Sequence, residues 1–81
     1  MLNQSPQILL IEGDATLLEI TAFRLELLGY QVITYDSAEK ALDWLKDQLP
    51  STVIVDYVLP AWTVLSLLIA SVTTRVPVTF Q

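Results

Sequence analysis

Three short runs rich in apolar and β-branched residues, separated by helix-length segments, constrain the fold of this chain most. The runs cover residues 7–11, 31–35 and 52–56. Short, nearly continuous apolar runs are typical of strands covered on both faces, as in parallel sheets. Strands that alternate with helices predict an α/β fold with right-handed crossovers. The chain has 81 residues, enough for one small domain.

The segments between these runs carry helix signals. Asp14 is a candidate N-cap for a helix that reaches about Leu28, where Gly29 supplies the stop. Residues 36–39 form a capping-box-like start for a second helix, whose apolar positions extend to Leu49 and which Pro50 ends. Apolar residues within 17–28 cover most of the first helix, so we expect it to need a neighbouring helix as well as the sheet. A third helix is predicted over 62–72 and a fourth strand over 76–80.

Composition excludes several functions. The chain has no Cys and no His, which removes disulfides, thiolate metal sites and the commonest general base. Four basic residues against nine acidic ones give a net charge of -5, which argues against nucleic-acid binding. The first residues show no signal-peptide pattern, so a cytoplasmic location is the expectation.

Acidic residues follow two of the predicted strands. Glu12 and Asp14 come after the first, and Asp56 closes the third. Sites in open parallel sheets form outside the carboxyl ends of the strands, at the point where the strand order reverses. Clustered carboxylates repel one another unless a cation joins them, and Mg²⁺ suits carboxylate and carbonyl oxygens. A carboxylate can also be the nucleophile in phosphoryl transfer. No glycine-rich phosphate loop is present, so another molecule would have to donate the phosphoryl group.

Four motifs resemble the receiver domain of two-component response regulators, in order and in spacing. They are ILLIEGD (8–14), GYQV (29–32), SAEKAL (37–42) and VIVDYVLP (53–60). The resemblance implies a flavodoxin-like, doubly wound parallel sheet. The sheet is expected to be incomplete, with about four strands and three helices. It also implies a phosphorelay module, not an enzyme, that accepts a phosphoryl group from a histidine kinase or phosphotransfer protein.

By this resemblance Asp56 is the phosphoacceptor, Glu12 is the first residue of the metal-binding acidic pair, and Val58 lends its backbone carbonyl to Mg²⁺. The second acidic position of the family is Gly13 here. Asp14 is the candidate replacement, although an N-cap is its alternative role. We therefore expect a Mg²⁺ site formed by Glu12, Asp14, Asp56 and Val58, with binding that is weak or lost.

Residues 61–81 differ in character from residues 1–60, because Arg75 is their only charged residue. Receivers typically continue after Leu-Pro with a small residue and then Met-Asp-Gly-Ile-Glu or Met-Asp-Gly-Leu-Glu. Residues 61–68 can be encoded by a DNA string that, when read from two bases later, encodes Met-Asp-Gly-Ile-Glu-Phe-Ile. We hypothesise that 1–60 is the receiver-like portion and 61–81 a frameshifted tail; an ordinary diverged helix is the alternative. Codons that do not regroup into the family motif would exclude the frameshift.

Two further functions stay open. A pseudo-receiver would act only as a protein-interaction module, with Gly13 abolishing metal-dependent phosphorylation. A small membrane-associated protein is the other, because residues 57–74 carry no charge, although Pro60 and the Ser and Thr residues in this stretch make a membrane segment the less favoured interpretation. The broad apolar face of residues 17–28 also predicts self-association.

Overall fold

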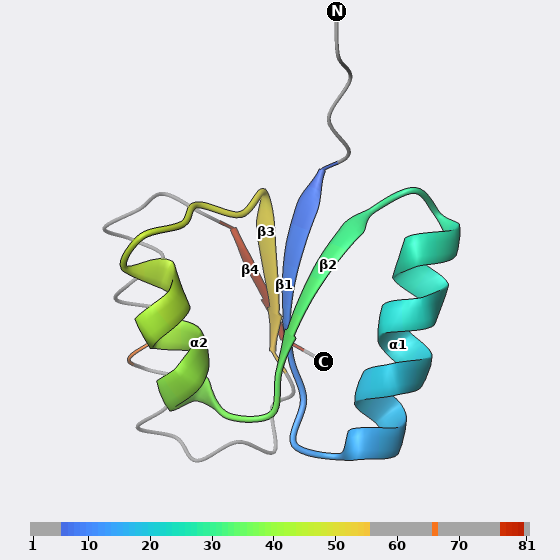
Figure 1. Ribbon diagram of the computed structural model, residues 1–81, viewed down its shortest axis with the longest axis horizontal. Coiled ribbons are helices and arrows are strands. Elements are labelled where there is room, and N and C mark those ends of the chain that lie inside the picture. The colour runs from blue at the N-terminus through green and yellow to red at the C-terminus, as the bar shows by residue number, and fades with distance from the viewer. Residues whose placement is uncertain (1–5, 56–65, 67–76, 81) are drawn as a thin grey trace, which may run out of the picture.

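A computed structural model describes residues 6–55, 66 and 77–80 of the chain. The elements run β1 (Gln7–Ile11), α1 (Ala15–Leu27), β2 (Gln31–Tyr35), α2 (Ala38–Leu45), β3 (Thr52–Val55) and β4 (Val78–Phe80). The four strands form one sheet in the order β2-β1-β3-β4, and every neighbouring pair is parallel. Helices α1 and α2 cover opposite faces of this sheet (Figure 1). The predicted flavodoxin-like, doubly wound fold is confirmed.

The core lies on the face of the sheet that α2 covers. Leu9 and Ile11 of the central strand β1 are fully buried there, beside Val53 and Val55 of β3. The small and branched side chains of α2 complete this layer: Ala38, Ala41 and Leu45. The other β1 residues, Ile8 and Leu10, are buried as well, so the central strand is covered on both sides as its apolar run predicts.

Helix α1 begins and ends as expected. The Asp14 carboxylate accepts a hydrogen bond from the backbone N–H of Leu17 at 3.0 Å, which satisfies one free donor of the first turn. At the other end Gly29 has φ +96°, a left-handed conformation that glycine adopts without a side-chain penalty. The helix packs on β1 and β2, yet it has no buried residue. Its apolar surface therefore exceeds what the described part of the chain covers.

Helix α2 is shorter than the sequence predicts. Ser37 caps its start by accepting a hydrogen bond from the backbone N–H of Lys40 at 3.4 Å. The helix ends at Leu45, after which the N–H groups of Lys46 and Asp47 bond to carbonyls three residues back. A residue before proline is disfavoured in the helical conformation, and Leu49 precedes Pro50. Leu49 lies beyond the end of the helix, is exposed, and does not join the helical apolar stripe that was predicted for it.

Loss of the Ser37 cap should destabilise the protein modestly. We expect Ser37→Ala to lower the free energy of unfolding by about 0.5–1 kcal/mol, because one backbone donor of α2 loses its partner. Urea denaturation followed by circular dichroism would measure the change. Ser51→Ala, at an exposed serine outside any helix, is the control and should change the free energy of unfolding by less than about 0.5 kcal/mol. Equal effects for the two variants would contradict the assigned cap.

The C-terminal predictions are tested only in part. Strand β4 lies within the predicted range 76–80 and pairs with β3, with Val53 opposite Val78. Of the predicted helix over 62–72, only Ser66 belongs to the described residues, and its backbone is helical. Within the described ranges, no helix has the length and apolar content needed to cross a bilayer.

Candidate functional site

The candidate site begins where the central strands end. Ile11 and Val55 are the last residues of β1 and β3, and they are partners in the parallel register. The next residue in the chain is Glu12 after β1 and Asp56 after β3. Asp56 and Val58 themselves lie outside the described residues. The structure therefore describes the sheet edge of the predicted site and the residues that follow β1.

Glu12 is held at this edge by backbone and side chain together. Its N–H bonds to the carbonyl of Tyr35 at 3.1 Å, which extends the β1–β2 ladder by one residue. Its carboxylate Oε1 accepts a hydrogen bond from the backbone N–H of Asp14 at 3.2 Å. Only 7% of Glu12 is exposed, and among the described residues it is the one buried charged side chain. A carboxylate seldom occupies such a position without a partner, because burying a charge is costly.

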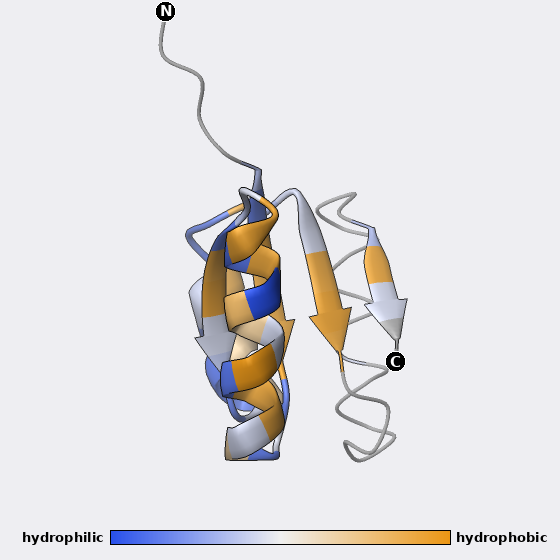
Figure 2. Cartoon of the chain, turned by 90° about the vertical axis from the view of Figure 1, so that its right-hand side faces the viewer, coloured by the Kyte–Doolittle hydropathy of each residue, from blue (hydrophilic) through white to orange (hydrophobic). Residues whose placement is uncertain are grey.

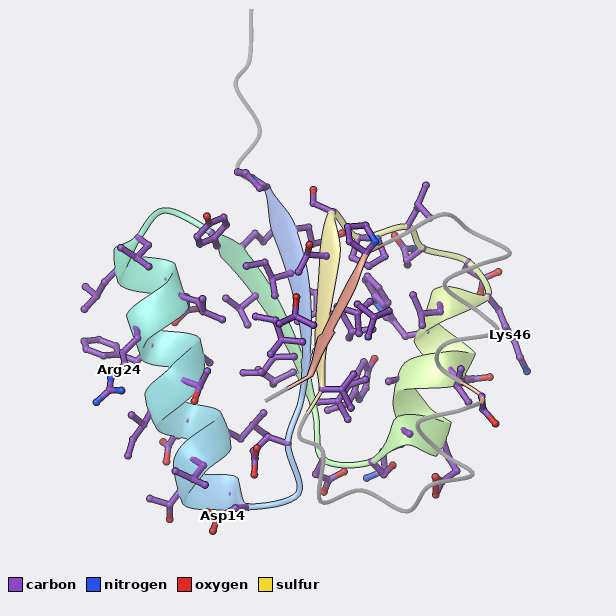
Figure 3. All side chains as sticks on the ribbon, turned by 180° about the vertical axis from the view of Figure 1, so that it is seen from behind. Asp14, Arg24 and Lys46 are labelled. Carbon is purple, nitrogen blue, oxygen red and sulfur yellow. The ribbon has the colours of Figure 1, made fainter. Side chains whose placement is uncertain are left out.

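Asp14 has a different task from Glu12. Its side chain is committed to the first turn of α1 through the hydrogen bond from Leu17, and the residue is exposed at the start of the helix (Figure 3). The contact of Asp14 with Glu12 is made by the backbone N–H of Asp14, which donates to the Glu12 carboxylate, and not by the Asp14 carboxylate. The alternative role of Asp14, an N-cap, is therefore confirmed. Its predicted role as a metal ligand stays a prediction.

Gly13, between these two residues, has room for a side chain. Apart from Gly13 and its two chain neighbours, no heavy atom of the described residues lies within 4 Å of the place where its Cβ would be. Among the two glycines, the left-handed conformation is recorded for Gly29 alone, so the backbone at position 13 does not require glycine. No sequence pattern reveals this open space. The described surroundings therefore leave room for a Cβ at position 13.

The described residues offer the type of ligand atom that Mg²⁺ binds, although few such atoms. Glu12 offers a hard carboxylate oxygen fixed at the carboxyl edge of the sheet, which is the ligand type that Mg²⁺ takes. Within the described residues, no group of three or more acidic, histidine or cysteine side chains is gathered around one point. A complete site would need Asp56 and Val58 from the chain after β3.

Comparison with known proteins points to one class. No protein-family model matches the chain. The chain is similar to the "Probable transcriptional regulator ycf27" of Porphyra purpurea, with 37% identity over 60 residues, which is 74% of this chain and 25% of the relative. The protein of the same name from Guillardia theta is 30% identical over 59 residues, 73% of this chain and 23% of that protein. The matched part thus spans about a quarter of these relatives.

Two solved structures that resemble this chain are response regulator receivers. A response regulator receiver protein from Burkholderia phymatum superposes with a TM-score of 0.82 at 25% identity, over 94% of this chain and 64% of that one. The non-phosphorylated HemR receiver domain from Leptospira biflexa superposes with a TM-score of 0.76 at 28% identity, over 94% of this chain and 63% of that one. Both likenesses extend over nearly the whole chain.

Proposed function

Because this chain carries the first four strands of a response regulator receiver domain, we propose that it accepts a phosphoryl group on Asp56. The observation that carries the proposal is the buried Glu12 at the end of β1. It stands one residue beyond Ile11, whose register partner Val55 directly precedes Asp56. In parallel strands that end in register, the next residues emerge at the same edge. Such a pair of carboxylates favours a cation between them, and a cation held there would attract the oxygens of a phosphoryl group.

The proposed reaction is a transfer between two proteins. A carboxylate oxygen of Asp56 attacks the phosphorus of a phosphohistidine on a histidine kinase or phosphotransfer protein. The P–O bond to Asp56 forms, the P–N bond breaks, and the released imidazole nitrogen keeps the electron pair and takes a proton from solvent. The chain would be a stoichiometric acceptor and not an enzyme with turnover of its own.

Each residue at the edge has a part in this proposal. Glu12, Asp56 and the Val58 carbonyl would hold Mg²⁺, which would neutralise charge on the transferred phosphoryl oxygens. The Asp14 N–H fixes one oxygen of Glu12 by its 3.2 Å hydrogen bond, so that the carboxylate is oriented before a cation arrives. Gly13 contributes no ligand, which supports weak Mg²⁺ binding and slow phosphorylation.

The same Gly13 favours a second candidate function. A receiver fold with one carboxylate too few would act as a protein-interaction module whose surface is recognised without phosphorylation. The two candidates differ in what the unchanged chain does when Mg²⁺ and a phosphodonor are both abundant. Only the phosphoacceptor gains a covalent phosphoryl group.

Intact-mass spectrometry tests the proposal. The full chain is incubated with Mg²⁺ and acetyl phosphate, and we expect a product heavier by one phosphoryl group. Asp56→Asn should remove this product completely. Asp36→Asn is the matched control, because Asp36 follows β2 as Asp56 follows β3 and is paired with Lys40 at 3.1 Å; it should leave labelling unchanged. Labelling of Asp56→Asn equal to that of the unchanged chain would exclude Asp56, and an unlabelled chain would favour the interaction module.

A further inference from the structure

Helix α1 carries apolar residues on two opposite sides. At 100° per residue, Leu18, Ala22 and Leu25 share the side that faces the sheet, and all three are partly buried. The opposite side carries three more apolar residues, with a threonine one turn before them. We name this row the outer seam: Thr16, Ile20, Phe23 and Leu27. The outer seam is exposed, with Phe23 60% and Leu27 70% accessible. Figure 2 views α1 from this side and shows the apolar residues along it.

The apolar part of the outer seam forms the floor of an open groove of about 650 Å³. Among the described residues, those that line the groove all belong to α1: Glu19, Ile20, Phe23, Arg24, Glu26 and Leu27. Contiguous apolar surface rimmed by charges is typical of a protein-interaction site. The lining residues do not include Glu12 or Asp14, which stand at the carboxyl edge of the sheet.

The spacing within the outer seam is that of a coiled-coil interface. Its positions 16, 20, 23 and 27 follow one another by four, three and four residues, the pattern of heptad positions a and d. Glu19 and Glu26 then occupy one flank and Arg24 the other, where its side chain projects from the helix (Figure 3). The ion pairs found among the described residues all lie in the region of α2, so these three charges are available to a partner.

We propose that two copies of the chain pair through their outer seams, with the two α1 helices parallel. In a parallel coiled coil, a residue that flanks the seam on one side pairs with a residue of the other helix. That partner flanks the seam on the opposite side and lies five positions later in the sequence. Glu19 of one protomer thus faces Arg24 of its partner, and two-fold symmetry repeats the contact. An antiparallel pair in which all four seam positions meet would instead place Glu19 near Glu26 and Arg24 near Leu17, so Arg24 would lose its acidic partner. The charges therefore select a second, parallel copy as the occupant.

The pair is weak and depends on concentration. A helix of 13 residues is about 20 Å long, so its outer seam buries less than the roughly 800 Å² per partner of a standard interface. Thr16 adds a hydroxyl where an apolar side chain would pack better, which weakens the first turn of the seam. We expect a Kd of about micromolar or weaker. The pairing uses α1 alone, so it holds whether or not Asp56 accepts a phosphoryl group.

Sedimentation equilibrium of the full chain over a concentration series tests the pairing. We expect a monomer–dimer equilibrium, and Phe23→Glu should raise the Kd by at least about thirtyfold, because it places a charge at the centre of the seam. Leu28→Glu is the matched control: Leu28 is 73% exposed but lies outside the seam, and the same substitution there should leave the Kd within about threefold. A chain that is monomeric at every concentration overturns the proposal, as do aggregates that Phe23→Glu does not change. Binding to lipid vesicles without pairing in solution also overturns it.

Charge exchange and cross-linking test the orientation. Glu19→Arg and Arg24→Glu should each weaken the dimer, and the double variant should restore it, because the ion pairs reform with reversed signs. The chain has no cysteine, so Thr16→Cys introduces a single thiol at an exposed position of the seam. A parallel dimer brings the two copies of position 16 together, and mild oxidation should give a disulfide-linked dimer. A double variant that fails to restore pairing, or a cysteine at position 16 that does not cross-link a demonstrated dimer, overturns the parallel arrangement.

Discussion

Replacing Leu9 with alanine is expected to lower the free energy of unfolding by about 3 kcal/mol or more. Leu9 is at the middle of β1, is fully buried, and belongs to the core cluster formed with β3 and α2. Its truncation leaves a cavity between the central strands and the helix that covers them. A domain of this size has a total stability of about 4–12 kcal/mol, so the variant loses a large part of it. Urea denaturation followed by circular dichroism would measure the loss.

The matched control for Leu9 is another leucine that the structure leaves in solvent. Leu49 is 64% exposed, and Leu49→Ala should change the free energy of unfolding by less than about 0.5 kcal/mol. Both variants must be compared at one protein concentration, since pairing of α1 would add stability that depends on concentration. If the two substitutions destabilise equally, β1 is not the centre of the core.

Gly13→Asp should strengthen Mg²⁺ binding by at least about tenfold, which is the lower range seen when residues that support a metal site are changed. Position 13 has room for a Cβ, since beyond its chain neighbours no atom of the described residues lies within 4 Å of that point. The new carboxylate would stand next to Glu12, whose own oxygen is already held by the Asp14 N–H. Isothermal titration calorimetry with MgCl₂ would measure the affinity, and labelling by acetyl phosphate should become faster in parallel.

Gly13→Asn separates charge from shape. The asparagine side chain has nearly the same volume as that of aspartate but no negative charge, so we expect Gly13→Asn to gain little Mg²⁺ affinity. Without Mg²⁺, Gly13→Asp should be less stable than Gly13→Asn, because neighbouring carboxylates repel one another, and added Mg²⁺ should reverse that order. If aspartate and asparagine have the same effect on Mg²⁺ binding, position 13 is not part of a metal site.

The strands and their parallel order could be predicted from the sequence because their signals are local and strong. The apolar run of β1 requires cover on both faces, and the capping residues Asp14 and Ser37 mark the starts of both helices. The second apolar side of α1 was also visible as an excess of apolar positions. Periodicity could not show what covers this second side, because an exposed apolar row and a buried one have the same spacing.

Other features depend on three-dimensional surroundings. Helix α2 ends at Leu45 and leaves Leu49 exposed, and the helical spacing of the leucines does not reveal this early end. The open space at Gly13 and the use of Asp14 as a cap depend on where neighbouring atoms lie, which no spacing rule encodes. Asp56 and Val58 were identified from the motif, and their placement lies outside the described residues.

The most direct measurement is the location of the phosphoryl group in the labelled chain. Borohydride reduction converts an aspartyl phosphate to homoserine, and peptide mass spectrometry then shows which residue was modified. After incubation with acetyl phosphate and Mg²⁺, we predict homoserine at position 56 in the unchanged chain, and in higher yield in Gly13→Asp. Modification at Asp14 or Asp36 instead, or none even in Gly13→Asp, would contradict the assignment of Asp56 as the phosphoacceptor.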